Sequence, residues 1–192
     1  MTITDAPQTG AIILPNFDLV EATLRLEGTA PLICHKWSEK AKRQMLDKQM
    51  KRANSGKAAK DPEADYLGSL YEHPEGGYGF PSVAFKAAAV RAGTYMDHKM
   101  TFLRGAFHVL GELVKIEGEP SMREDMVRVS MTSDIRYRGE FRQWAVDLPL
   151  RFNAAALSLE QIVALFHVAG FSVGVGEWRP EKNGQYGTFE VA

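Results

Sequence analysis

Hydrophobic and polar residues alternate along two long segments of the chain. From residue 20 to residue 27 every second residue is apolar, and the same period of two runs through residues 143–152. This period is typical of a strand that buries one face. Shorter apolar runs predict further strands at residues 113–117, 126–131, 171–175 and 186–191.

A basic segment in the first third of the chain has the signals of a helix. It follows Ser38, a residue type that caps helices, begins with Glu39 and is later rich in lysine and arginine, which suits the helix dipole. Its apolar stripe is narrow and contains Met45, Leu46, Met50 and Ala53. Because such a helix gains little from packing on its own domain, we expect it to be loosely attached or to order on a partner.

Two other helices are predicted to lie in the core. Residues 83–92 are apolar on most sides, and Ser82 is the expected N-cap. Further along, Ser158 and Gln161 form a capping box for a helix that Gly170 should end. Both helices therefore have a surface that can cover a sheet.

The order of the elements predicts the fold class. A strand is followed by a basic helical insertion, a helix, several antiparallel strands, a helix and two closing strands, which is a decorated βαββαβ pattern. We therefore predict an α+β, ferredoxin-like (RRM-like) antiparallel sheet with helices on one face. We expect a flexible arm at residues 1–17 and a single domain at 18–192 with an insertion at about 36–75. Residues 133–141 are expected to form an exposed hairpin tip or loop.

Composition excludes several classes of protein. The 192 residues are 45% hydrophobic and 24% charged, which argues against disorder and against a membrane protein. The longest apolar stretches are far shorter than the roughly 20 residues that span a bilayer, and the polar N-terminus does not resemble a secretory signal. We therefore expect a cytoplasmic protein without a membrane partner. Cys34 is the sole cysteine, which excludes an internal disulfide and a thiolate-rich zinc cluster.

Charge is separated along the chain. Residues 36–60 contain nine basic and two acidic residues, a net charge of +7, whereas the whole chain has a net charge of −1. The remaining residues therefore carry a net charge of −8. A segment this basic produces a local positive field, which attracts a polyanion or the acidic face of a neighbouring copy.

Two motifs resemble those of a known family. Residues 79–91 read Gly-Phe-Pro-Ser-Val-Ala-Phe-Lys-Ala-Ala-Ala-Val-Arg, with a proline, small residues, a lysine and an arginine at the start of a core helix. Residues 171–179 read Phe-Ser-Val-Gly-Val-Gly-Glu-Trp-Arg and residues 184–189 read Gly-Gln-Tyr-Gly-Thr-Phe, which together resemble a C-terminal glycine-rich loop. Both are similar to motifs of the RAMP superfamily, whose best-known members coat guide RNA in CRISPR complexes. The likeness covers roughly residues 18–191.

The resemblance implies a protein that coats a nucleic-acid strand. It is greatest to backbone subunits that polymerise along RNA, so it implies single-stranded RNA or DNA as the ligand and a homo-oligomer in the form of a filament or ring. CRISPR or recombination proteins are the implied partners, and a stand-alone or phage-encoded relative in recombination or replication fits equally well. The candidate nucleic-acid-binding residues are His35, Lys36, Trp37, Lys40, Lys42, Arg43, Lys48, Lys51, Arg52, Lys86, Arg91, Arg136, Tyr137, Arg138, Arg142, Trp178, Arg179 and Lys182.

Two other functions stay open. One is a structural or inhibitory protein that mimics a CRISPR subunit and binds other proteins, with the acidic and basic parts of neighbouring copies bound to each other. The other is a metal-independent ribonuclease with His35 as its acid or base. Residues 31–37 contain no carboxylate for metal-dependent cleavage, and the sequence has no zinc or nucleotide-binding signature. We therefore expect a non-catalytic protein without a metal or cofactor. Gly174 and Gly176 either let phosphates approach or form a structural bulge.

Overall fold

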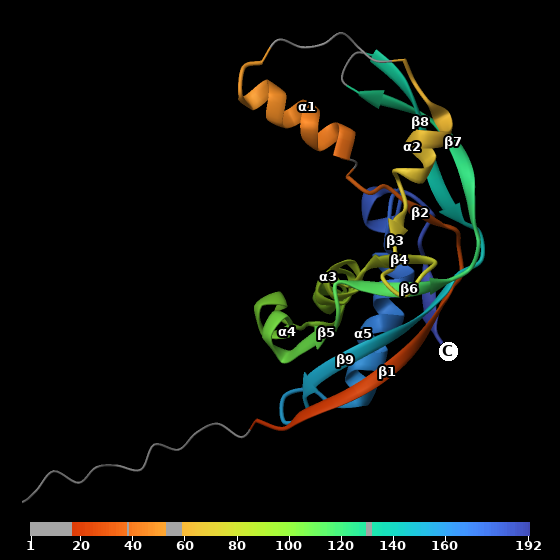
Figure 1. The fold of residues 1–192 in the computed structure, drawn as a ribbon. Coiled ribbons are helices and arrows are strands. Elements are labelled where there is room, and N and C mark those ends of the chain that lie inside the picture. The colour runs from red at the N-terminus through yellow and green to blue at the C-terminus, as the bar shows by residue number, and fades with distance from the viewer. Residues whose placement is uncertain (1–16, 38, 53–58, 130–131) are drawn as a thin grey trace, which may run out of the picture.

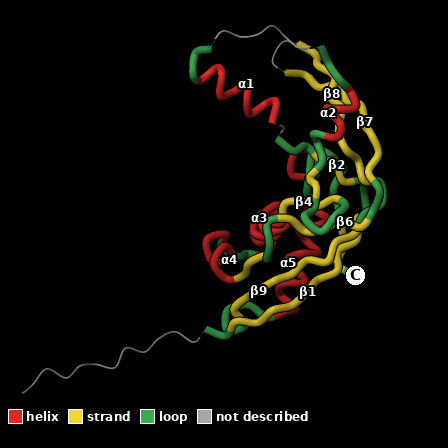
Figure 2. The backbone as a smooth tube through the Cα atoms, in the orientation of Figure 1, coloured by secondary structure: helices red, strands yellow, loops and turns green. Residues whose placement is uncertain are grey.

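The computed structural model describes residues 17–37, 39–52, 59–129 and 132–192. Residues 1–16 of the expected arm at 1–17, and the expected cap at Ser38, lie outside these ranges. The strands form a curved layer, and the helices lie on its concave side (Figure 1, Figure 2).

The larger sheet contains seven strands among the described residues, in the spatial order β10-β1-β9-β6-β4-β3, and β5 also pairs with β9. Every pairing is antiparallel. The strands are β1 (Leu19–Gly28), β3 (Tyr71–Glu72), β4 (Tyr78–Pro81), β5 (Phe107–Val109), β6 (Leu113–Glu117), β9 (Ala145–Asn153) and β10 (Phe189–Val191).

The chain order of the central elements confirms the predicted fold class. It runs β1, α3 (Ser82–Ala92), β6, β9, α5 (Leu159–Ser172) and β10, which is the ferredoxin-like βαββαβ pattern. Helices α3 and α5 pack against each other and cover one face of the sheet (Figure 1). Short helices α4 (Met100–Ala106), η1 (Gly93–Met96) and η2 (Pro180–Lys182) connect these elements.

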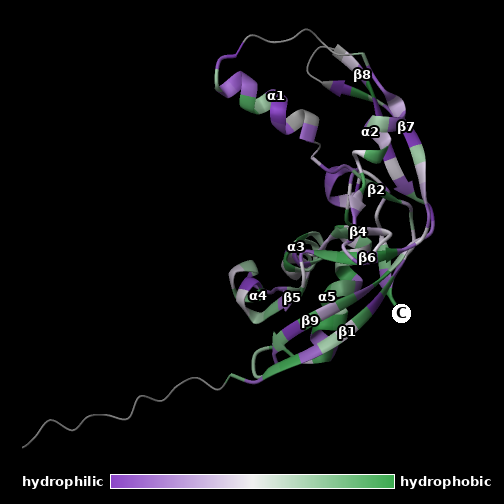
Figure 3. Ribbon diagram, viewed as in Figure 1, coloured by the Kyte–Doolittle hydropathy of each residue, from purple (hydrophilic) through white to green (hydrophobic). Residues whose placement is uncertain are grey.

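The predicted alternation of β9 is confirmed. Val146, Leu148 and Leu150 are buried, whereas Asp147 and Arg151 on the opposite face are exposed. Strand β9 pairs along its whole length with β1, whose inward residues complete the same face of the core. Figure 3 shows hydrophobic residues concentrated in β1, α3 and α5. This apolar packing is the main stabilising contact of the body.

A second sheet extends the molecule beyond this body. It has the order β2-β8-β7 among the described residues, and its strands are β2 (Leu32–Cys34), β7 (Pro120–Val129) and β8 (Thr132–Phe141). Strands β7 and β8 form a long hairpin, and α2 (Pro62–Leu67) packs on β8. The basic helix α1 (Glu39–Gln49) has no extensive contact with any other described element. This agrees with the expected loose attachment.

The prediction of a loop at residues 133–141 was wrong. These residues belong to β8, which pairs with β7 and, at its end, with β2. The charges that suggested exposure are partly buried, since Arg138 and Glu140 are only 3% and 7% exposed. Side-chain ion pairs therefore allow a charged sequence to form an inner strand. Strand β7 also begins earlier than predicted, at Pro120.

The predictions near the C-terminus were also wrong in part. Phe171 and Ser172 end α5 and do not start a strand, and only residues 189–191 of the last predicted strand are paired. Gly170 does not stop α5 but lies inside it, where a Cβ would clash with the carbonyl oxygen of Phe189. The glycine therefore lets α5 approach β10 closely. The capping box of Ser158 and Gln161 is confirmed.

The expected N-cap of α3 is replaced by a tertiary contact. Pro81 occupies the N-cap position, and the Ser82 hydroxyl donates a hydrogen bond to the Gly111 carbonyl oxygen. Ser82 is therefore used to fix the start of α3 against the loop before β6. A serine before an apolar run supports either role, and only the neighbouring loop decides between them.

Candidate nucleic-acid interface

The segment between β2 and α1 contains three of the candidate residues, His35, Lys36 and Trp37. The backbone N–H of Lys36 donates to the Ser69 carbonyl oxygen at 2.9 Å, which fixes the segment as it leaves β2. The Trp37 indole is 56% exposed. Lys42 Nζ lies 5.7 Å from the centroid of this indole, within the range of a cation–π contact. The segment thus presents an aromatic surface with a cation above it.

The glycine-rich loop after α5 lies against β2. Gly176 has φ of +79°, and a Cβ there would come within 2.7 Å of the Ile33 carbonyl oxygen. That oxygen accepts a hydrogen bond from the backbone N–H of Glu177 at 3.1 Å. The geometry thus gives Gly176 a packing role, the structural alternative considered from the sequence. The next residue, Trp178, is 42% exposed.

One side-chain contact joins this loop to the segment before α1. His35 Nδ1 lies 3.3 Å from Glu177 Oε1. The hydrogen bond with His35 lowers the pKa of Glu177, against the effect of burial, and the positive charges of Arg138 and Arg136 lower it further. Trp37 is two residues from His35, and Trp178 directly follows Glu177. The backbone distance from the contact to each of the two tryptophan residues is therefore at most about 8 Å.

A network of buried charges lies on the hairpin near this loop. Arg123 donates to Asp125 Oδ1 at 2.8 Å and to Glu140 Oε1 at 2.7 Å, and Arg138 donates to Asp125 Oδ2 at 3.3 Å. The Arg123 guanidinium also lies 4.7 Å from the centroid of the Tyr186 ring. The network thus attaches the glycine-rich loop to the hairpin. Because Arg138 is enclosed, a nucleic-acid strand on the surface cannot reach its guanidinium. Arg138 is therefore not part of the candidate interface.

Sequence reasoning missed Arg123, Asp125 and Glu140. Arg123 lies directly opposite Arg138 in the hairpin, and Asp125 lies opposite Arg136. The positive charges of Arg123 and Arg138 repel each other across the strands, so carboxylates beside them are needed to neutralise them. Pairing residues 120–129 with 132–141 in the sequence would have revealed this arrangement, but residues 133–141 were interpreted as a hairpin tip or loop.

The candidate cations of α1 differ in their availability. Lys42 pairs with Glu39 at 2.5 Å, and Arg52, just after the helix, pairs with Asp47 at 3.5 Å. Among the candidate cations on or just after α1, Arg43, Lys48 and Lys51 are exposed and have no ion pair with a described residue. The side chain of Lys40 lies outside the described residues. The exposed face of α1 is therefore basic, although two of its charges are partly neutralised.

The other candidates are divided among three places. On the hairpin, Arg142 is largely exposed, and Arg136 lies 3.9 Å from Asp134 on the same strand as Tyr137. In the loop, Arg179 donates to the Gly176 carbonyl oxygen at 3.1 Å and pairs with Glu181, and Lys182 follows in η2.

Lys86 and Arg91 occupy the third place, a depression between α3 and α4 to which no other candidate contributes. The structure thus brings together the residues around His35 and Trp178, and Glu181, which pairs with both Arg179 and Arg91, links this group to the last turn of α3.

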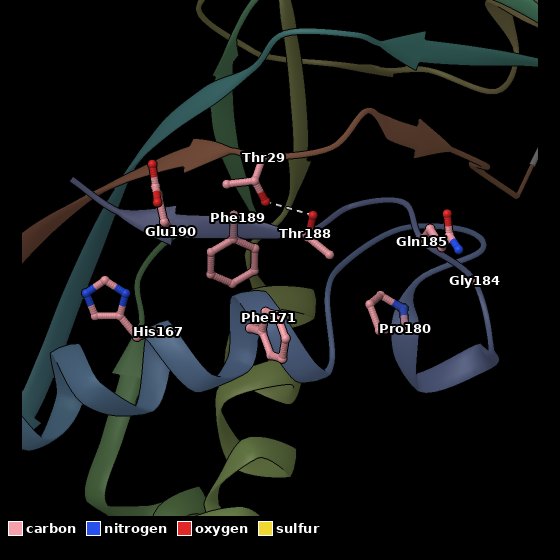
Figure 4. Close-up of a pocket in the computed structure, with 9 residues that line it drawn as sticks. All are labelled: Thr29, His167, Phe171, Pro180, Gly184, Gln185, Thr188, Phe189 and Glu190. Atoms are coloured by element: carbon pink, nitrogen blue, oxygen red, sulfur yellow. Dashed lines mark hydrogen bonds between the residues drawn. The ribbon is translucent and has the colours of Figure 1, made fainter.

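A second depression lies beside the glycine-rich loop. Figure 4 shows Phe171 of α5 near Phe189 of β10, and the Thr29 hydroxyl donates to the Thr188 hydroxyl at 2.7 Å. No lysine or arginine is among its lining residues. It therefore does not favour a polyanion. Elsewhere in the described ranges, no group of three or more His, Cys, Asp or Glu side chains is arranged to hold a metal ion.

No family model matches the sequence, and no curated protein matches it. The fold is similar to a solved structure, that of Cmr6 from Pyrococcus furiosus. The similarity covers 92% of this chain and 100% of the Cmr6 chain, with 10% sequence identity and a TM-score of 0.45. Among the helices that the structure describes, none has the length and apolar character needed to cross a membrane.

Proposed function

We propose that this chain binds single-stranded nucleic acid at the surface formed by the segment before α1 and the glycine-rich loop. In this proposal bases stack on Trp37 and Trp178, and phosphates contact Lys36 and the basic face of α1. The observation that carries it is the contact between His35 and Glu177, because it couples two exposed indoles that are far apart in the sequence. Exposed aromatic rings beside cations are the usual basis of binding without base specificity.

The charge distribution supports the same role. Arg43, Lys48 and Lys51 are exposed on or just after α1, which has no extensive packing on the other elements that the structure describes. Counterions condensed on the nucleic acid are released when such cations bind its phosphates. Binding should therefore weaken steeply as the salt concentration increases. The role also agrees with the motifs at residues 79–91 and 171–189, which resemble those of strand-coating proteins. We extend the proposal to a CRISPR-like or phage recombination context on that resemblance alone.

We further propose that copies of the chain associate along the strand. Met45 and Leu46 on α1 and Met50 just after it are 51–53% exposed, so the described residues leave this part of the apolar stripe uncovered. Apolar stripes of this kind are normally covered by another surface. A neighbouring copy on the same strand would supply one, and the acidic remainder of the chain complements the basic helix.

Fluorescence polarisation with labelled oligouridylate and oligothymidylate at low and high salt tests the proposal. Trp37→Ala and Trp178→Ala should each weaken binding roughly tenfold, since stacking of one base contributes about 1–3 kcal/mol. Tyr95→Ala is the matched control, because Tyr95 is an exposed aromatic residue on η1, outside the proposed surface. Absence of binding to either strand at low salt would exclude the proposal. Cleavage of the RNA that is lost in His35→Ala would favour the ribonuclease alternative instead.

A further inference from the structure

A depression between α3 and α4 has a floor of aliphatic side chains and a basic rim. Its volume of about 470 Å³ is within the range of pockets that bind ligands or side chains. Val83, Ala87, Val90 and Met100 provide the apolar surface. Lys86, Arg91 and Arg104 provide the positive charge.

The rim has more positive charge than its surroundings neutralise. Among the described residues that line it, none carries a carboxylate. Lys86 Nζ lies 2.9 Å from the Arg104 carbonyl oxygen and 2.9 Å from His108 Nδ1, so neither contact supplies a negative charge. Partial burial lowers the pKa of Lys86, which is the expected effect for a cation without a counter-ion.

The two arginines of the rim differ. Arg91 pairs with Glu181 at 3.3 Å. Arg104 has no ion pair with any residue that the structure describes. Two of the three cations therefore lack an acidic partner. An anionic ligand would supply it.

The floor identifies the class of ligand. It has no aromatic ring to stack on a nucleobase, and Phe107, whose ring lies 6.0 Å from Lys86 Nζ, is fully buried. Aliphatic surface instead suits a bulky apolar side chain. Val83 is 66% exposed and Phe102 on α4 is 44% exposed, so apolar surface continues beyond the depression. Exposed apolar surface beside cations is typical of a site that binds a protein.

We propose that this depression is a docking site for an acidic segment of a partner protein, which inserts an apolar side chain against Val83, Ala87 and Val90 and directs flanking carboxylates to Lys86 and Arg104. The residues that line the depression are distinct from those of the surface around Trp37 and Trp178, and the docking proposal does not depend on nucleic-acid binding there. Charge complementarity determines the orientation of the segment.

A fluorescein-labelled peptide, Asp-Asp-Asp-Leu-Phe-Asp-Asp, tests the docking site by polarisation against the full chain. Val83→Asp adds a carboxylate at the edge of the floor, and Arg104→Glu reverses a charge of the rim. Each should weaken binding about tenfold. Lys115→Glu is the matched control, since Lys115 is an exposed lysine on β6 outside the depression. A peptide with Ser-Ser in place of Leu-Phe should bind more weakly than the original.

Equal binding of the acidic peptide by wild type and both variants would overturn the proposal. A second result would also overturn it: the wild type binds oligouridylate but not the peptide, and both variants lose the binding of oligouridylate. The depression would then belong to a nucleic-acid surface. Both substituted side chains are exposed, and circular dichroism verifies the fold. In the unmodified protein, methyl resonances of Val83, Val90 and Met100 should shift on addition of the peptide. Unchanged methyl resonances at saturating peptide would also contradict the docking site.

Discussion

The ferredoxin-like body and the hairpin extension bury their strands in different ways. In the body, Phe85 of α3 is fully buried and its ring lies 6.0 Å from those of Phe80 and Phe189. In the extension, strands β7 and β8 bury Asp125, Arg138 and Glu140, whereas Arg123, which pairs with both carboxylates, is only partly buried. Apolar contacts are non-directional, whereas a buried charge depends on each hydrogen-bonding partner. The body should therefore tolerate conservative changes that the extension does not.

The largest effect is expected from a cavity in the body. Phe85→Ala removes a fully buried ring that contacts three other aromatic residues, so the free energy of unfolding should fall by about 4 kcal/mol. Urea unfolding followed by circular dichroism measures the loss. Phe85→Leu should cost less than half as much, because it leaves a smaller cavity. A loss below about 1 kcal/mol for the alanine variant would show that the body has no shared apolar core.

The next largest effect is expected at the buried network. Arg138→Met leaves Asp125 with one of its two arginine partners in a buried position, which should lower the free energy of unfolding by about 3 kcal/mol. Arg142→Met is the control, because the Arg142 side chain is 78% exposed and its pair with Glu140 should contribute less than about 1 kcal/mol. Equal losses in the two variants would show that burial of the network does not matter.

A smaller, pH-dependent effect is expected where the loop meets the segment before α1. The pKa of Glu177 is lowered in the folded protein, so its stabilising contribution is present above the ordinary glutamate pKa of about 4.3 and is lost as pH falls through the lowered value. Glu177→Gln should therefore reduce stability by less than about 1 kcal/mol at neutral pH. Urea unfolding of both proteins from neutral pH to about pH 3 measures the difference. It should shrink on acidification, and a difference that grows would contradict the assigned contact.

The smallest effect on stability is expected from α1. Replacing Met45, Leu46 and Met50 by glutamine together should change the free energy of unfolding by no more than about 0.5 kcal/mol, because these side chains already face solvent. Sedimentation velocity with a bound oligonucleotide should then show weaker association between copies. A stability loss above about 2 kcal/mol would instead mean that α1 packs on its own chain.

Periodicity and capping signals in the sequence predicted the arrangement of the body, apart from the start of α3 and the segments after Gly170. The alternation in β1 and β9, the capping box at Ser158 and the order of elements predicted the βαββαβ fold. Each of these signals is local, because a period of two or a serine three residues before a glutamine acts within a few residues of the chain. The exposed indoles of Trp37 and Trp178 were also predicted as candidates from the sequence.

The tertiary structure alone decided the extension and the grouping of the candidates. Arg138 and Glu140 look exposed in the sequence, but their partners on β7 are more than ten residues away, so only strand pairing reveals that they are buried. His35 and Glu177 are separated by 142 positions, and Gly170 has its role only because β10 crosses α5. Contacts between distant residues have no local pattern. Their presence depends on the fold that the local patterns produce.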